Sequence, residues 1–154
     1  MVTHCGDNDN LVYHLVNQVA ELARRISCHV QAHSQRDVRR TETPNATMTT
    51  LASPTLGPTA GLSLWQVEMT AGAHGPLHVF DSEQLWTVLD GRVIVDVDGQ
   101  ACALEPGDTI VLPGGKTRQI KAVNDARLLA CGRGDATASV PCEAQPRGTP
   151  PWIA

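Results

Sequence analysis

The sequence lacks an excess of positive charge and any long apolar run. Its formal net charge is −4 over 154 residues, which provides no basic surface for nucleic acid or for an anionic membrane. No run of 18 apolar residues occurs, so no membrane-spanning helix is predicted. We therefore expect neither nucleic acid nor a membrane as partner, and a chain of this length predicts one domain.

Paired cysteines and a secretory signal are also missing. The five cysteines are odd in number and show no CxxC spacing, which argues against a zinc ribbon or a disulfide framework. Residues 1–10 show no basic region followed by an apolar core, the pattern of a secretory signal. We expect reduced thiols and a cytoplasmic location.

What the sequence does contain is, first, a segment with helical periodicity. Residues 10–38 carry apolar side chains at steps of three and four, which predicts an amphipathic helix that Asp9 or Asn10 would cap. One helix cannot form a helix-turn-helix motif. We expect residues 1–40 to be an N-terminal helical extension that packs on the main domain or on a partner.

Two segments without a regular period flank the central part of the chain. Residues 41–60 are rich in Thr and Pro and almost uncharged, which is typical of a linker. A second interpretation is that translation begins near Met48, which would make the upstream helix optional. Residues 133–154 are Pro-rich and end near Trp152–Ile153, so we predict a tail that packs on the barrel or on a neighbouring subunit.

Between these segments, residues 61–132 show apolar side chains in alternation, punctuated by Gly, Pro and Asp-Gly turns. This pattern predicts an all-β domain, a small antiparallel β-barrel or sandwich, preceded by the one helix. Exposed strand edges in so small a barrel favour a homodimer. The predicted strands are 62–70, 77–80, 84–89, 92–97, 100–104, 109–113, 117–123 and 126–132.

The turns of this region stand at specific spacings. Gly91 closes the run Val88–Gly91, and the turn Pro106-Gly107-Asp108 follows. Five residues then separate Gly107 from Pro113-Gly114-Gly115. Over about residues 60–132 this pattern resembles the two motifs of the cupin superfamily. The resemblance implies a small β-barrel or jelly roll, usually dimeric, with its site in the barrel mouth.

The same resemblance places the metal ligands of the family. Counting back from Gly91 puts the first His at His78, the second His at Phe80 and the Glu at Gln84, and the last His falls on Arg118. A phenyl ring, a neutral amide and a guanidinium are poor ligands for a divalent metal. We therefore expect no metal cofactor at the usual site.

An alternative metal site would use a different histidine. His74 lies four residues before His78, and a bend at Gly75–Pro76 could bring the two rings together to hold Fe, Mn, Ni or Zn. Glu83 has the wrong parity to join them if Gln84 points inward. Such a rearranged site would make the protein a metal-dependent, dioxygenase-like cupin.

The motif register and the alternation predict a set of inward-facing side chains around a small-molecule pocket. His78 is the candidate acid or base, and Arg118 and Gln84 are candidates for binding a carboxylate or an oxyanion. The remaining candidates for substrate contact are Phe80, Trp86, Val88 and His74. These residue types favour a metal-independent isomerase, epimerase or cyclase that acts next to a carbonyl of a natural-product-like metabolite.

Two other interpretations of these residues stay open. The barrel could bind a metabolite without changing it, or serve as an assembly module through the N-terminal helix. Arg118 could sit at the barrel rim and pair with Asp81, Glu83 or Asp108, and Trp86 could be a core residue rather than a substrate contact.

Overall fold

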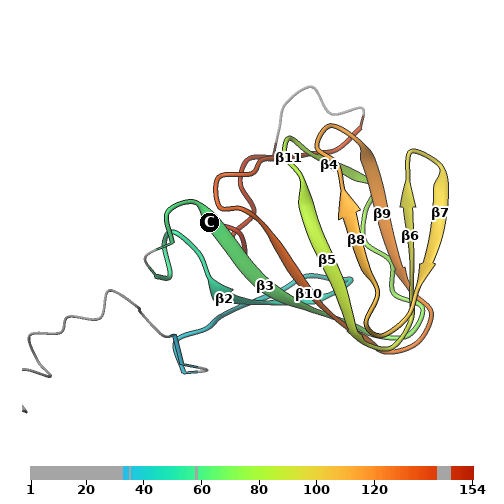
Figure 1. Cartoon of the computed structure of the whole chain (residues 1–154), viewed down its shortest axis with the longest axis horizontal. Coiled ribbons are helices and arrows are strands. Elements are labelled where there is room, and N and C mark those ends of the chain that lie inside the picture. Colours follow the sequence, from blue (N-terminus) through green and yellow to red (C-terminus); the bar gives the residue numbers. More distant parts are fainter. Residues whose placement is uncertain (1–32, 35, 58, 142–146) are drawn as a thin grey trace, which may run out of the picture. The chain divides into compact units, whose positions relative to one another are not determined.

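The strands predicted between residues 62 and 132 are all present in the computed structural model of the chain (Figure 1). The structure describes residues 33–34, 36–57, 59–141 and 147–154, which belong to the unit His33–Ala154. The expected all-β fold is confirmed for these residues, none of which is helical. The strands are β1 (Arg39–Glu42), β2 (Thr47–Ala52), β3 (Leu62–Met69), β4 (His78–Phe80), β5 (Gln84–Asp90), β6 (Val93–Val97), β7 (Gln100–Leu104), β8 (Thr109–Leu112), β9 (Thr117–Ala122), β10 (Ala126–Arg133) and β11 (Ala138–Ser139).

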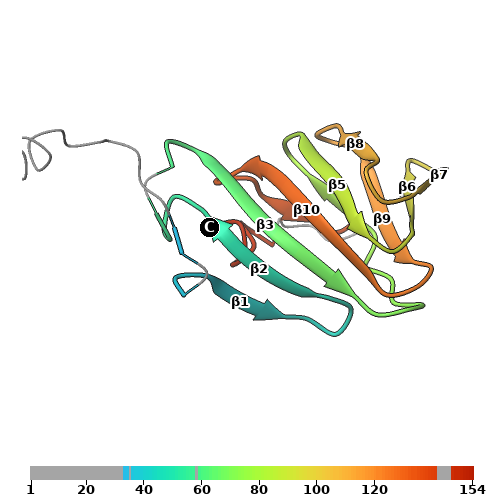
Figure 2. The same cartoon turned by 60° about the horizontal axis from the view of Figure 1, so that its bottom comes forward.

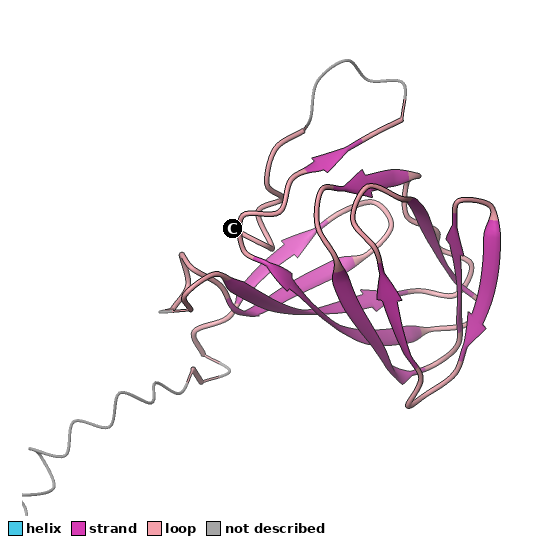
Figure 3. Cartoon of the chain, turned by 45° about the horizontal axis from the view of Figure 1, so that its top comes forward, coloured by secondary structure: helices cyan, strands magenta, loops and turns pink. Residues whose placement is uncertain are grey.

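The strands form two antiparallel sheets that face each other (Figures 1 and 3). One sheet has the order β1-β2-β3-β10-β5-β8 and the other the order β11-β4-β9-β6-β7. Alternate residues of β3 and β10 are buried, so each strand turns one face toward the space between the sheets. This arrangement is the predicted barrel of jelly-roll type.

Tight turns set the register of the strands, and Gly91 is the clearest case. Its φ is +77°, and a Cβ at this position would collide with the carbonyl oxygen of Asp125. Only glycine has both the conformational freedom and the small size that this turn between β5 and β6 requires. The glycine used to count the motif positions is therefore fixed by the fold itself.

The expected linker over residues 41–60 is corrected by the structure. β2 pairs with β3 along Thr47–Ala52, and β1 forms the edge beyond it (Figure 2). The Thr-rich sequence forms strands because β-branched side chains suit the pleated backbone, and Thr50 is fully buried there. A start at Met48 would remove β1, the partner of β2.

The predicted N-terminal helix lies mostly outside the described residues. Where the prediction overlaps them, residues 33–34 and 36–40 are not helical, and Arg39 and Arg40 begin β1. The expected end of the helical extension at residue 40 is therefore wrong. No helix long and apolar enough to cross a membrane is found in the part of the chain that the structure describes.

The C-terminal segment, residues 147–154, lies against the inner side of the larger sheet (Figure 2). Ile153 is fully buried in the core, and Trp152 packs against it. The hydroxyl of Thr50 donates to the carbonyl of Trp152 at 2.9 Å, and that of Ser63 donates to the carbonyl of Ile153. These contacts join the segment to β2 and β3, so it forms part of the barrel wall.

Candidate functional site

A cavity of about 570 Å³ lies between the two sheets and the C-terminal segment. β2 and β3 form one wall, β4 and β9 another, and residues 147–152 a third. The lining is mostly apolar, and His78 is the one histidine among its described residues. A volume of this size suits a small organic molecule. The cavity is therefore the candidate binding site.

The four positions matched to the metal-binding motif are neighbours beside this cavity. His78 and Arg118 are directly paired across β4 and β9. The rings of His78 and Phe80 meet edge to face at 5.3 Å between centroids, and the Arg118 guanidinium lies 5.5 Å from the Phe80 centroid. Arg118 also donates to Gln84 Oε1 at 3.4 Å.

His78 is half-buried, and its ring orientation is fixed by a backbone group. Its Nδ1 lies 2.8 Å from the carbonyl oxygen of Pro76. A carbonyl can only accept, so Nδ1 carries the hydrogen and Nε2 is left with its lone pair. Burial lowers the pKa of His78, an effect that the Pro76 hydrogen bond opposes and the Arg118 charge reinforces. His78 is thus a neutral imidazole at neutral pH.

Arg118 and Gln84 lie behind the cavity wall rather than in it. Arg118 is 0% exposed and Gln84 is 1% exposed, and neither lines the cavity. Arg118 donates to the Pro113 carbonyl at 2.6 Å, and burial lowers its pKa to about 10. The interpretation of Arg118 as a rim residue paired with an acidic side chain is wrong.

The residues at the motif positions do not fit a divalent metal. A buried guanidinium occupies one ligand position and a phenyl ring another, and neither offers a lone pair to a cation. The rearranged site is not formed either, because His74 is exposed, bridges to Lys121 and does not line the cavity. Within the described ranges, no group of three His, Cys, Asp or Glu side chains is placed to hold a metal ion.

The other predicted substrate contacts are divided between wall and core. Phe80 and Trp86 line the cavity, whereas Val88 is buried in the core and does not reach it. Glu83 is exposed and Gln84 is buried, in agreement with the parity argument.

Sequence reasoning missed several cavity residues. Trp65 lies on the buried face of β3, and the same alternation that selected Trp86 could have found it. Met48 and Trp152 also line the cavity, but they come from the expected linker and tail. No periodicity marked either segment as part of the barrel.

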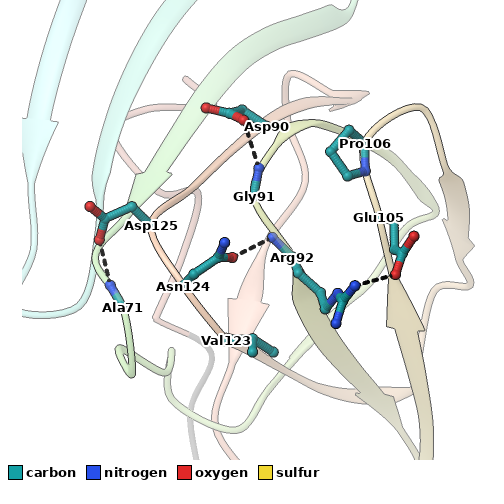
Figure 4. Close-up of a pocket in the computed structure, with 9 residues that line it drawn as sticks. All are labelled: Ala71, Asp90, Gly91, Arg92, Glu105, Pro106, Val123, Asn124 and Asp125. Atoms are coloured by element: carbon teal, nitrogen blue, oxygen red, sulfur yellow. Dashed lines mark hydrogen bonds and ion pairs between the residues drawn. The ribbon is translucent and has the colours of Figure 1, made fainter.

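A second hollow, of about 870 Å³, lies at the opposite end of β5 (Figure 4). Its polar side chains are used within the turns: Asp125 accepts from the amide of Ala71 at 2.8 Å, and Asn124 accepts from the amide of Arg92 at 2.7 Å. Arg92 and Glu105 form an exposed ion pair, with 2.6 Å between the guanidinium nitrogen and the carboxylate oxygen. These contacts stabilise the turns, so we place the candidate site in the cavity between the sheets.

The two facing sheets, with a cavity between them, form a barrel of jelly-roll type. The family model for the cupin domain matches residues 65–131. This stretch of the chain is therefore similar to the cupin domain, in agreement with the motif spacing of residues 60–132.

Solved structures with the same fold come from several kinds of protein. KdgF from Halomonas sp. is 20% identical, with 68% of this chain and 93% of that chain covered and a TM-score of 0.59. The polyketide cyclase RemF from Streptomyces resistomycificus is 20% identical, with 70% of this chain and 83% of that chain covered and a TM-score of 0.57.

A third similar structure is the salicylate 1,2-dioxygenase from Pseudaminobacter salicylatoxidans. It is 18% identical, with 76% of this chain and 31% of that chain covered and a TM-score of 0.54. No curated protein matches the chain. These similarities show the fold alone, so the function must be argued from the site.

Proposed function

We propose that this protein is a metal-independent enzyme that moves a proton at a carbon next to a carbonyl of a small organic molecule. The reaction class is isomerisation, epimerisation or ring closure. The single observation that carries the proposal is His78, a titratable side chain with a fixed ring orientation in a mostly apolar cavity.

His78 is suited to act as the base. Pro76 holds the hydrogen on Nδ1, so Nε2 can accept a proton from the substrate carbon. The lowered pKa keeps the ring neutral and ready to accept at neutral pH. Return of the proton to another carbon, or to the other face of the same carbon, completes an isomerisation without any redox change.

Arg118 acts through its charge and not by contact. Removal of a proton next to a carbonyl builds negative charge on the oxygen, and a buried cation nearby stabilises that charge strongly in a low-dielectric interior. Arg118 is separated from the cavity by Phe80, over whose ring it lies. Gln84 and Pro113 hold the guanidinium in place, so the direct oxyanion contacts expected of Arg118 and Gln84 are replaced by a positioned charge.

The test is hydrogen–deuterium exchange at the carbon next to a carbonyl. Protein dialysed against EDTA, with its metal content measured, is incubated in D₂O with a panel of aromatic and aliphatic cyclic ketones, and exchange is followed by ¹H NMR. We expect exchange with at least one ketone, its loss in His78→Ala, and a lower rate in Arg118→Met. A rate that requires added Fe, Mn, Ni or Zn would contradict the proposal, as would equal exchange in His78→Ala.

A non-catalytic binding protein is the second candidate. The observation that favours it is the position of Arg118 and Gln84 behind the wall, which keeps both side chains out of contact with a ligand. In that case a ligand recovered from the cavity is chemically unchanged and no ketone exchanges faster than in buffer.

A further inference from the structure

In this aromatic-poor chain, the Phe and Trp side chains that the structure describes gather at one place. Only 3% of its residues are Phe, Trp or Tyr. Every Phe and Trp of the described ranges lines the cavity between the sheets, and so do both described methionines. These six residues are Trp65, Phe80, Trp86, Trp152, Met48 and Met69.

Such a lining selects for flat and polarisable ligands. Aromatic faces and edges pack best on other rings, and thioethers make favourable contacts with ring edges. Trp65 and Trp86 already meet edge to face at 6.4 Å and 88°, so their rings are held at a right angle. A cavity of about 570 Å³ with these walls has room for a fused ring system.

In this part of the interior, several buried hydrogen-bond donors have no acceptor among the described residues. Gln84 Oε1 accepts from Trp86 Nε1 at 3.1 Å and from Arg118 at 3.4 Å. The buried donors Trp65 Nε1, Gln84 Nε2 and Arg118 Nε find no acceptor among the described residues. A buried N–H without an acceptor is costly, so these groups call for an acceptor atom from a bound molecule or from water.

Trp65 is the one of the three that also lines the cavity. Its side chain borders that of Gln84 over Gly132, where a Cβ would lie 3.0 Å from Gln84 Cγ and 3.5 Å from Trp65 Cη2. The absence of a side chain at position 132 leaves both groups in place. Trp86, by contrast, has its indole N–H engaged by Gln84.

We propose that the cavity takes a fused aromatic ring system bearing a carbonyl oxygen, and that Trp65 Nε1 binds this oxygen. Trp65 is thereby a specificity-determining residue. The inference rests on the proposed function in that it takes the same cavity as the substrate site and names the class of substrate. In this inference the donor to the carbonyl oxygen is the indole N–H of Trp65. The sequence had suggested Arg118 and Gln84 as the donors.

The test compares three bicyclic probes of matched size by isothermal titration calorimetry. 1-Tetralone has both the aromatic ring and the carbonyl, tetralin lacks the oxygen, and 1-decalone keeps the oxygen but is saturated and not flat. We expect 1-tetralone to bind more tightly than either of the other two probes. Its advantage over tetralin should be roughly 3- to 10-fold, because tetralin cannot accept the hydrogen bond. Equal affinities, or no binding of any probe, would overturn the inference.

Two tryptophan variants separate the oxygen contact from ring packing. Trp65→Phe is expected to lower the affinity for 1-tetralone more than that for tetralin, so that the preference for 1-tetralone is lost. Trp86→Phe, whose N–H is already engaged, is the matched control and should keep the preference for 1-tetralone. A preference that survives in Trp65→Phe shows that water or another group serves the oxygen, and the inference then fails.

Two measurements on the unmodified chain keep the two proposals distinguishable: binding of 1-tetralone by calorimetry, and exchange next to its carbonyl by ¹H NMR. Trp65-dependent binding without any exchange next to the carbonyl would refute the proposed chemistry and uphold the inference. Exchange on a ketone that lacks an aromatic ring, without binding of 1-tetralone, would do the reverse.

Discussion

The guanidinium of Arg118 lies over the ring of Phe80, 5.5 Å from its centroid. In the cupin motif both positions belong to metal-binding histidines. Here a cation and an aromatic face attract each other where two imidazoles would share an ion. At these two positions the positive charge therefore belongs to the chain itself.

Arg118 carries a buried charge, and no carboxylate is paired with it in the described part of the chain. Its cation–π contact and hydrogen bonds offset the cost of burial only in part, since burial lowers its pKa to about 10. We predict that Arg118→Met changes the free energy of unfolding by about 2 kcal/mol or less in either direction. Urea denaturation followed by fluorescence measures this. A much larger loss would show that Arg118 is chiefly structural.

His78 makes stability depend on pH in a defined direction. Its pKa is below the ordinary value of 6.5, so the unfolded chain takes up a proton that the folded chain resists. The free energy of unfolding should therefore fall as the pH drops from about 6.5 toward the folded pKa. Urea midpoints at pH 7.5 and pH 5 for the unmodified chain and for His78→Gln isolate this contribution. A steeper loss of stability in the variant would contradict it.

The motif register predicts that a metal site can be restored. Phe80→His, Gln84→Glu and Arg118→His, together with the native His78, would place four ligands at positions that are already neighbours. We expect this triple variant to bind Co²⁺ with a visible absorption band that the unmodified chain lacks. Adding His78→Ala to the triple variant should abolish the band, and its persistence would mean that the ligands lie elsewhere.

Ile153 ties the C-terminal segment into the core. It is fully buried, so Ile153→Ala should lower the free energy of unfolding by about 2–5 kcal/mol. Val123→Ala, at a side chain that is 47% exposed, is the control and should cost less than about 0.5 kcal/mol. Equal effects in denaturant titrations would show that the segment is not held by this side chain.

The barrel strands were predictable because their turns are chemically distinct. Gly91, Gly99 and Gly107 all have positive φ, and each lies where the alternation of a predicted strand stops. β1 and β2 were missed because a Thr-rich sequence without charge reads equally well as a linker. Their assignment depends on pairing with β3, a long-range contact that local periodicity does not contain.

The site was predictable in its members more than in their roles. Counting from Gly91 and strand parity placed His78, Phe80, Gln84 and Arg118 together, and the structure has them adjacent. Strand alternation predicts which side chains point inward, but it does not predict which of them line the cavity. That depends on how the two sheets and the C-terminal segment pack, and here it leaves Arg118 and Gln84 behind the wall.

The bonds from Thr50 and Ser63 to the carbonyls of Trp152 and Ile153 also have a consequence for biosynthesis. A ribosome delivers the strands of both sheets before it delivers residue 152, because domains emerge from the N-terminal side first. The cavity wall that residues 147–152 form is therefore the last part of the site to be made. A ligand can therefore occupy a completed cavity only after the segment carrying Trp152 has been made and has docked.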